Sequence, residues 1–255
     1  MLALSAAHSS RMTTADTLED ALRRLNAKDS TLQRIWLNDN SIGDEGAAAL
    51  AGALDRGSFP ELQSIWLGWN RIGADGAKAL AQALAQGSFP KLQVIDLRGN
   101  NIGVEGARAL AQALERGSFL ELQVIWLNDN SIGDAGATEL AAVLERGSCP
   151  KLQDIELGSN NIGDEGAKAL AGALERGSFP ELKSIDLYGN NIQVKMRHEV
   201  TRAIADMHCR VRVLAFLGAE LDLAPVTPVR RFLWRDGDRA AMHRVARFVM
   251  VAYDG

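Results

Sequence analysis

The residue types that most often do chemistry are sparse in this sequence. It has four histidines, His8, His198, His208 and His243, and two cysteines, Cys149 and Cys209. The adjacent His208 and Cys209 could suggest a metal or thiol site, but no second pair of ligands is spaced to complete one. Glycine-rich phosphate loops, His-Glu-x-x-His pairs and nucleophile elbows are also missing from the sequence. We therefore expect no catalytic residue, metal or cofactor, and predict that the protein is not an enzyme.

Aromatic and charged residues at regularly spaced positions are better candidates for function. They occupy the third, fifth, seventh and eighth positions of a repeated unit, where side chains should point away from the core. Aromatic anchors with charged neighbours are typical of protein-binding hot spots. The candidate protein-binding residues are Trp36, Trp66, Trp69, Trp126, Asp96, Glu156, Asp186, Arg34, Arg98, Asp129 and Tyr188. The alternative is that the tryptophans only stack on one another, and that the acidic residues form a solvated face.

The units that position these residues recur every thirty residues. Each begins with a leucine and reads Leu-x-x-Ile-x-Leu-x-x-Asn-x-Ile; the leucines are Leu32, Leu62, Leu92, Leu122, Leu152 and Leu182. The first five units continue with Gly-x-x-Gly-Ala, a helix-like stretch and Gly-Ser. Such a period indicates a stack of similar supersecondary units.

Each unit switches from a period of two to a period of 3.6. In residues 64–67, Ile65 and Leu67 alternate with Ser64 and Trp66, which predicts a strand with one buried face. The following stretch should form a helix that ends at Gly87, with one apolar stripe made of Ala77, Leu80, Ala81 and Leu84. A strand, a helix and a return in every unit predict parallel strands joined by right-handed crossovers.

One asparagine keeps its place in all six units, at positions 40, 70, 100, 130, 160 and 190. A side-chain amide offers two donors and one acceptor, so a column of amides can satisfy backbone groups between stacked turns. We predict that this column is a structural ladder and not a catalytic one.

The segment from Leu122 to Ala137, LQVIWLNDNSIGDAGA, resembles the leucine-rich repeat of the ribonuclease-inhibitor type. The same class occurs in the repeat regions of NOD-like receptors and in Ran GTPase-activating proteins. The resemblance implies an α/β solenoid, a horseshoe with a parallel inner sheet and outer helices. It also implies an intracellular protein that binds a protein or peptide ligand on its concave strand face, for sensing or scaffolding. The alternative it leaves is a GTPase-activating regulator of a Ran-like small GTPase, for which Arg34 and Arg98 are the strand-face arginines.

Three regions follow from these patterns. Residues 1–31 should hold an N-terminal segment and a half-repeat cap with a helix from Thr17 to Leu25; residues 32–209 hold the repeats, with six strands. Residues 210–255 contain eight arginines and five acidic residues. We predict that this tail forms a helix that caps the array, and docking of a partner is the alternative. We expect the first residues to be frayed, with a transit peptide as the alternative.

The composition of the chain further restricts the classes of partner and the location that we expect. The chain has 255 residues and a formal net charge of −4, which argues against a nucleic-acid partner. No run approaches the ~20 apolar residues that a membrane-spanning helix needs. Two cysteines are too few for a disulfide framework, so we expect a reducing, cytoplasmic location. We also expect no small-molecule substrate.

The inward and outward assignment can be tested on two neighbouring residues of the fourth unit. Leu127→Ala should lower the free energy of unfolding by about 2 to 5 kcal/mol, because it opens a cavity in the core. Trp126→Ala should cost clearly less if its side chain faces outward. Chemical denaturation of both variants measures the difference, and equal losses would contradict the assignment.

Overall fold

The computed structural model describes residues 13–55, 57–117, 119–176, 181–193 and 196. Within them, seven parallel strands form one sheet whose order follows the chain. The strands are β1 (Thr14–Ala15), β2 (Arg34–Trp36), β3 (Ser64–Trp66), β4 (Val94–Asp96), β5 (Val124–Trp126), β6 (Asp154–Glu156) and β7 (Ser184–Asp186). This is the α/β solenoid of thirty-residue repeats that the sequence predicts.

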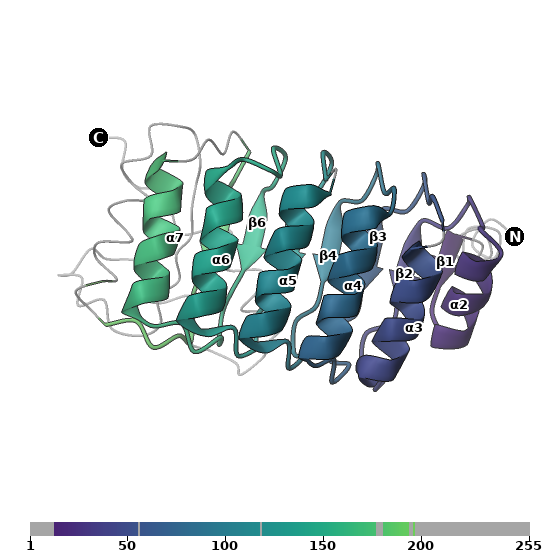
Figure 1. Ribbon diagram of the computed structural model, residues 1–255, viewed down its shortest axis with the longest axis horizontal. Coiled ribbons are helices and arrows are strands. Elements are labelled where there is room, and N and C mark those ends of the chain that lie inside the picture. The colour runs from purple at the N-terminus through teal and green to yellow at the C-terminus, as the bar shows by residue number, and fades with distance from the viewer. Residues whose placement is uncertain (1–12, 56, 118, 177–180, 194–195, 197–255) are drawn as a thin grey trace, which may run out of the picture.

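Six helices alternate with these strands and lie side by side along one face of the sheet (Figure 1). They are α2 (Leu18–Asn26), α3 (Gly43–Asp55), α4 (Ala74–Gln86), α5 (Gly103–Arg116), α6 (Gly133–Glu145) and α7 (Asp164–Arg176). The predicted apolar stripe of α4 is buried throughout, and Gly87 caps the end of that helix. Small residues let the helices pack closely: a Cβ on Gly76 would lie 2.9 Å from the Cβ of Ala47 in α3.

Strict register places equivalent residues of neighbouring units beside one another. Ile35 pairs with Ile65, and the isoleucine column continues along the sheet to Ile185, buried in every unit. Side chains on either side of each isoleucine point to the other face of the sheet, because successive strand residues alternate. We call this face, which the helices leave uncovered, the open face.

The N-terminal region contains a strand, β1, in addition to a helix, α2. Thr17 caps α2, accepting a hydrogen bond from the backbone of Asp20 at 3.1 Å. Before it, β1 adds a strand that pairs with β2. The buried Arg24 holds the two together, donating to the backbone oxygen of Thr14 at 3.1 Å and to Asp29 at 2.8 Å. The array therefore begins one strand earlier than the repeat pattern indicates.

The asparagine column is a ladder of hydrogen bonds between units, as predicted. The side-chain oxygen of Asn70 accepts from the backbone of Asn40 at 2.9 Å and of Ile42 at 3.3 Å. Its amide nitrogen donates to the carbonyl oxygen of Leu37 at 2.7 Å. The same amide-to-carbonyl bond across units recurs at Asn100, Asn130, Asn160 and Asn190. Each amide thus satisfies the loop backbone of the unit before it.

A second kind of link joins some of the helices. Asp44 of α3 accepts from the backbone of Gly73 at 2.7 Å and of Gly76 at 2.9 Å, so it caps the N-terminus of α4. Asp134 of α6 makes the equivalent bonds to Gly163 and Gly166 at α7. The matching positions of α4 and α5 are Ala74 and Val104, which cannot accept a hydrogen bond. The cross-unit cap is therefore present from α3 to α4 and from α6 to α7, and missing from α4 to α5 and from α5 to α6.

Two predictions lie outside the described residues: the frayed first residues, and the capping helix in residues 210–255. None of the helices in the described part of the chain is long and apolar enough to cross a membrane.

The contribution of the asparagine ladder to stability can be tested at Asn130. This residue is buried and donates to the carbonyl oxygens of Leu97, Leu127 and Asn128. Asn130→Ala should lower the free energy of unfolding by about 2 kcal/mol or more, since buried carbonyl groups lose their donors. Asn40→Ala is the control, because Asn40 is exposed and donates to Asn38 alone; it should cost under about 1 kcal/mol. Urea denaturation compares the two, and similar losses would show that the ladder does not stabilise the stack.

Candidate ligand-binding face

Three tryptophans form a continuous aromatic row on the open face. Trp36 and Trp66 are paired in register and stack, with ring centroids 4.8 Å apart at an interplanar angle of 29°. Trp126 lies two strands beyond Trp66, yet its ring meets the Trp66 ring edge to face at 5.2 Å. Trp36 and Trp66 are therefore direct neighbours on adjacent strands. The row ends in solvent at Trp36, which is 47% exposed.

Trp69 adds a fourth indole at the edge of this face, in the loop that follows β3. It is 49% exposed and has a left-handed backbone, with φ of 58°. Its ring lies over Gly99 of the next unit, where a Cβ would come within 2.1 Å of the indole. Gly99 also has a positive φ of 64°, which glycine adopts without a steric penalty.

Asp96 lies between Trp66 and Trp126 in the strand register, and it is fully buried. Its carboxylate pairs with Arg98, with 3.2 Å between Nε and Oδ2, and accepts from the Arg98 backbone at 3.1 Å. The guanidinium carbon of Arg98 lies 4.5 Å from the centre of the Trp126 ring. Burial raises the pKa of Asp96, although Arg98 and Asn38 act in the opposite direction. Asp96, Arg98 and Trp126 thus form a closed unit of carboxylate, guanidinium and indole.

This burial corrects one expectation from the sequence. Asp96 was predicted to be part of an exposed acidic stripe beside the tryptophans, but its side chain has no solvent-exposed surface. The reason is that the flanking indoles of Trp66 and Trp126 span the intervening strand and meet each other. Arg98 is likewise largely enclosed, with 23% of its side chain exposed.

The acidic character of the open face is concentrated at its C-terminal end. Glu156 lies beside Trp126 in the register, and Asp186 lies beside Glu156; both are partly buried. Asp154 is on the same face and accepts a hydrogen bond from the Ser184 hydroxyl. Burial, then the charge of Asp186, raises the pKa of Glu156 to about 7; Asp96 and Asp154 add to the rise, and Arg98 opposes it. Like charges therefore crowd this end of the sheet.

The remaining predicted residues are at the rims. Arg34 and Asp129 are exposed, and Tyr188 is 45% exposed in the loop after β7. The eleven predicted residues are thus not one uniform patch. The aromatic row covers β2 to β5, and the carboxylates follow it on β6 and β7.

Sequence reasoning missed Asn38, which ties neighbouring units together on this face. Its side chain accepts from the backbone of Gly68 at 2.7 Å and lies 3.4 Å from Asp96. No residue pattern marks Asn38, because the seventh position of the other units holds glycine, arginine, asparagine or tyrosine. Gly99 could have been found, since a glycine follows one unit after the large Trp69.

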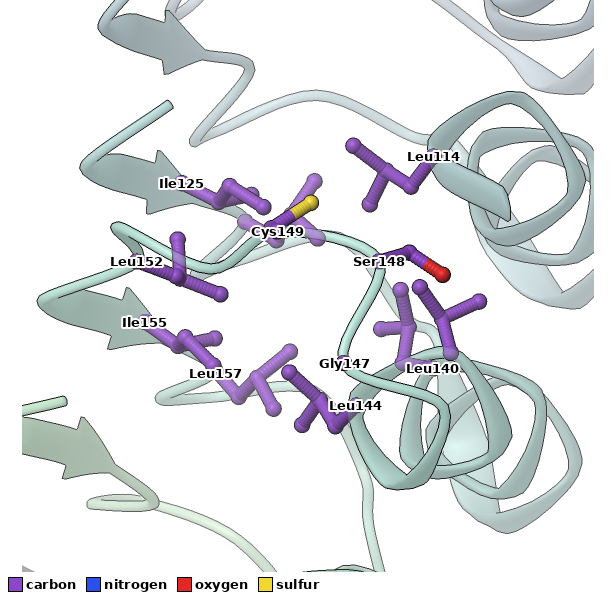
Figure 2. Close-up of a pocket in the computed structure, with 12 residues that line it drawn as sticks. Leu114, Ile125, Leu140, Leu144, Gly147, Ser148, Cys149, Leu152, Ile155 and Leu157 are labelled. Atoms are coloured by element: carbon purple, nitrogen blue, oxygen red, sulfur yellow. The ribbon is translucent and has the colours of Figure 1, made fainter. Parts of the chain in front are cut away.

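The interior offers no comparable site for a small ligand among the described residues. Its main cavity, about 20 Å³, is lined by leucines and isoleucines below Cys149 (Figure 2). Phe59, Phe89 and Phe119 fill the equivalent position in earlier units, so the cavity reflects the smaller side chain of Cys149. Burial raises the pKa of the Cys149 thiol to about 12, which disfavours the reactive thiolate. Within the same residues, no group of three or more His, Cys, Asp or Glu could hold a metal ion.

Comparison with known proteins identifies the repeat. Five segments match the leucine-rich repeat family model, at residues 28–51, 62–81, 90–111, 122–141 and 148–171. These matches are consistent with the strand and helix order of an α/β leucine-rich-repeat solenoid. They define the class of repeat, and the ribonuclease-inhibitor type stays a prediction.

Two solved structures are similar to the chain at low sequence identity. Leiomodin-1 actin-binding site 2 is 16% identical with a TM-score of 0.46, over 75% of this chain and 89% of that one. The tropomodulin C-terminal domain of Caenorhabditis elegans is 14% identical with a TM-score of 0.43, over 75% and 93% of the two chains. No curated protein is significantly similar to the chain in sequence.

The raised pKa of Glu156 predicts a pH-dependent stability. The ordinary pKa is 4.5 and the folded value is about 7, so the unfolded chain ionises first as the pH rises. Glu156 therefore destabilises the fold increasingly between about pH 4.5 and pH 7, and by a constant amount above that range. Glu156→Gln should stabilise the protein at about pH 8 by up to about 3 kcal/mol more than at about pH 4.

Thermal or urea unfolding across this pH range measures the effect. Glu165→Gln, on the exposed surface of α7, is the control for loss of one carboxylate. The same pH dependence in both variants would show that the effect does not arise at Glu156.

Proposed function

We propose that this chain is a non-catalytic, intracellular protein-interaction module that binds a protein or peptide ligand on the open face of its sheet. Leucine-rich repeats are suited to this role, because their regular core leaves one broad face for variable residues. The proposed anchors are Trp36 and Trp69, with Trp66 and Trp126 as the support on which the ligand rests.

One observation carries the proposal: two indoles remain nearly half exposed although each packs against the next unit. Trp36 is 47% exposed beside Trp66, and Trp69 is 49% exposed above Gly99. A tryptophan that only covered the sheet would gain by burying more of its ring. Exposed aromatic side chains fixed by packing are favourable anchors, because they lose little conformational entropy on binding.

The GTPase-activating alternative would rely on Arg34 and Arg98. Arg98 is engaged with Asp96 and Trp126, so it would have to leave both before it could reach a phosphate. Arg34 alone is exposed. We therefore favour simple binding, for which a GTP turnover assay with candidate small GTPases should show no acceleration.

Affinity capture from native cell extract tests the proposal. The Trp36→Ala/Trp69→Ala variant should lose a partner that the wild type retains, with a drop in affinity of about tenfold or more. Leu120→Ala is the matched control, because Leu120 is a large apolar residue, 62% exposed, in the loop between α5 and β5. Unchanged melting temperatures would confirm that the variants are folded. Retention of the same partners by the tryptophan variant would refute the assignment to the open face.

A further inference from the structure

We propose that the peptide segment bound by the open face carries an acidic side chain, whose carboxylate is held by Arg34 and Ser64. Apolar residues beside this acid would rest on the indoles of Trp36 and Trp69. The inference rests on the proposed function and names the chemistry of the partner. It concerns β2 and β3, toward the N-terminal end of the sheet (Figure 1).

Arg34 supplies a cation that has no partner in the described part of the chain. It lies on β2, two residues before Trp36 and on the same face of the sheet, and both side chains are exposed. Among the described residues, its guanidinium makes no ion pair or hydrogen bond. Residues 1–12, which precede β1 in the sequence, contain no aspartate or glutamate. A carboxylate from a ligand would therefore be the first acidic partner of this side chain.

Ser64 adds a hydroxyl beside this guanidinium. It pairs with Arg34 in the strand register and is only 6% exposed. Its hydroxyl makes no hydrogen bond with the described residues, although buried polar side chains normally have a partner. Two neighbouring strands thus present a guanidinium and a hydroxyl side by side, and neither donor has an acceptor there.

Another pair of strands on this face shows how such a site is filled. Ser184 pairs with Asp154 in the register, and its hydroxyl donates to the Asp154 carboxylate. Arg34 and Ser64 occupy the same two positions on β2 and β3, with a base in place of the acid. Hydrogen bonds to a carboxylate suit both donors, and those from a guanidinium are strengthened by charge. A carboxylate supplied by the ligand would therefore complete the arrangement.

Trp69 places an exposed indole where the backbone disfavours one. The eighth position of the unit has a positive φ in all six units, at residues 39, 69, 99, 129, 159 and 189. The other five units hold aspartate, glycine or serine there. Bulky side chains are disfavoured at positive φ, and residues held in such conformations cluster at binding sites. Apolar side chains next to the acid would cover the exposed part of this ring and of Trp36.

A single carboxylate fits this end of the face better than a phosphate or a nucleic acid. Arg34 is the one base at the outward positions of β2, β3 and the loops that follow them, and Asp39 is an exposed acid among the same positions. A phosphate group carries more negative charge than one arginine neutralises, and nucleic acids are bound through several bases. We therefore assign the site to an aspartate or glutamate side chain.

Panning a phage-displayed library of short random peptides against the full chain tests this inference. Peptides enriched on the wild type should combine aspartate or glutamate with apolar residues. Arg34→Gln should abolish the acidic enrichment, whereas Arg34→Lys should preserve it because the charge is kept. Lys168→Gln is the matched control, since it removes an exposed cation from α7; it should also preserve the enrichment.

Isothermal titration with the most enriched acidic peptide measures the contact itself. Replacing its acid by the corresponding amide should weaken binding to the wild type about tenfold and leave binding to the Arg34→Gln variant unchanged. Ser64→Ala should weaken binding of the acidic peptide about fivefold, with an unchanged melting temperature. Equal losses on the wild type and on the Arg34→Gln variant would show that the acid does not meet Arg34.

Enrichment of peptides without acids, no enrichment on the wild type, or tighter binding of a phosphoserine peptide would overturn the inference. Tighter binding after Glu220→Gln/Asp222→Asn would also overturn it, because the chain's own Glu-Leu-Asp-Leu stretch, residues 220–223, would then be the occupant. Peptides that lack acids but need Trp36 and Trp69 would leave the proposed function standing. Peptides that bind the Trp36→Ala/Trp69→Ala variant equally well would refute both.

Discussion

Satisfying the backbone between stacked units is the constraint on which the rest of this structure depends. Every unit returns from strand to helix through a loop whose polar groups become enclosed when the next unit stacks on it. The buried side chains of Asn70, Asn130 and Asn160 meet this demand with one amide each. Because the asparagine fixes the separation and phase of neighbouring units, the isoleucine column and the helix stripe fall into register. The open face inherits this register, so residues thirty apart in sequence become neighbours in space.

Most of the scaffold could be predicted because it depends on contacts that repeat. The strands, the helix stripe of α4 and the asparagine ladder each follow from a local pattern seen several times. The exceptions occur where the pattern is too short or unique. β1 comprises two residues and lacks the leucine that begins the other units, so no periodicity in the sequence predicts it. The cavity below Cys149 arises from a single replacement of phenylalanine.

The candidate site was predictable as a set of positions but not as a set of environments. Register alone places Trp36, Trp66 and Glu156 on one face. Whether a side chain on that face is exposed depends on the size of its neighbours on the two adjacent strands. Asp96 is covered because indoles stand on both sides of it, while Glu156 has an indole on one side and Asp186 on the other. Two carboxylates at the same repeat position therefore lie in different environments, one fully buried and one partly buried.

The aromatic row spans units whose helices lack the cross-unit aspartate cap. Ala74 and Val104 leave the junctions from α4 to α5 and from α5 to α6 without the aspartate link made by Asp44 and Asp134. On the opposite side of the same units, Trp66 and Trp126 meet across β4. The middle units are therefore joined by aromatic contacts on the open face, without an aspartate link on the helical side.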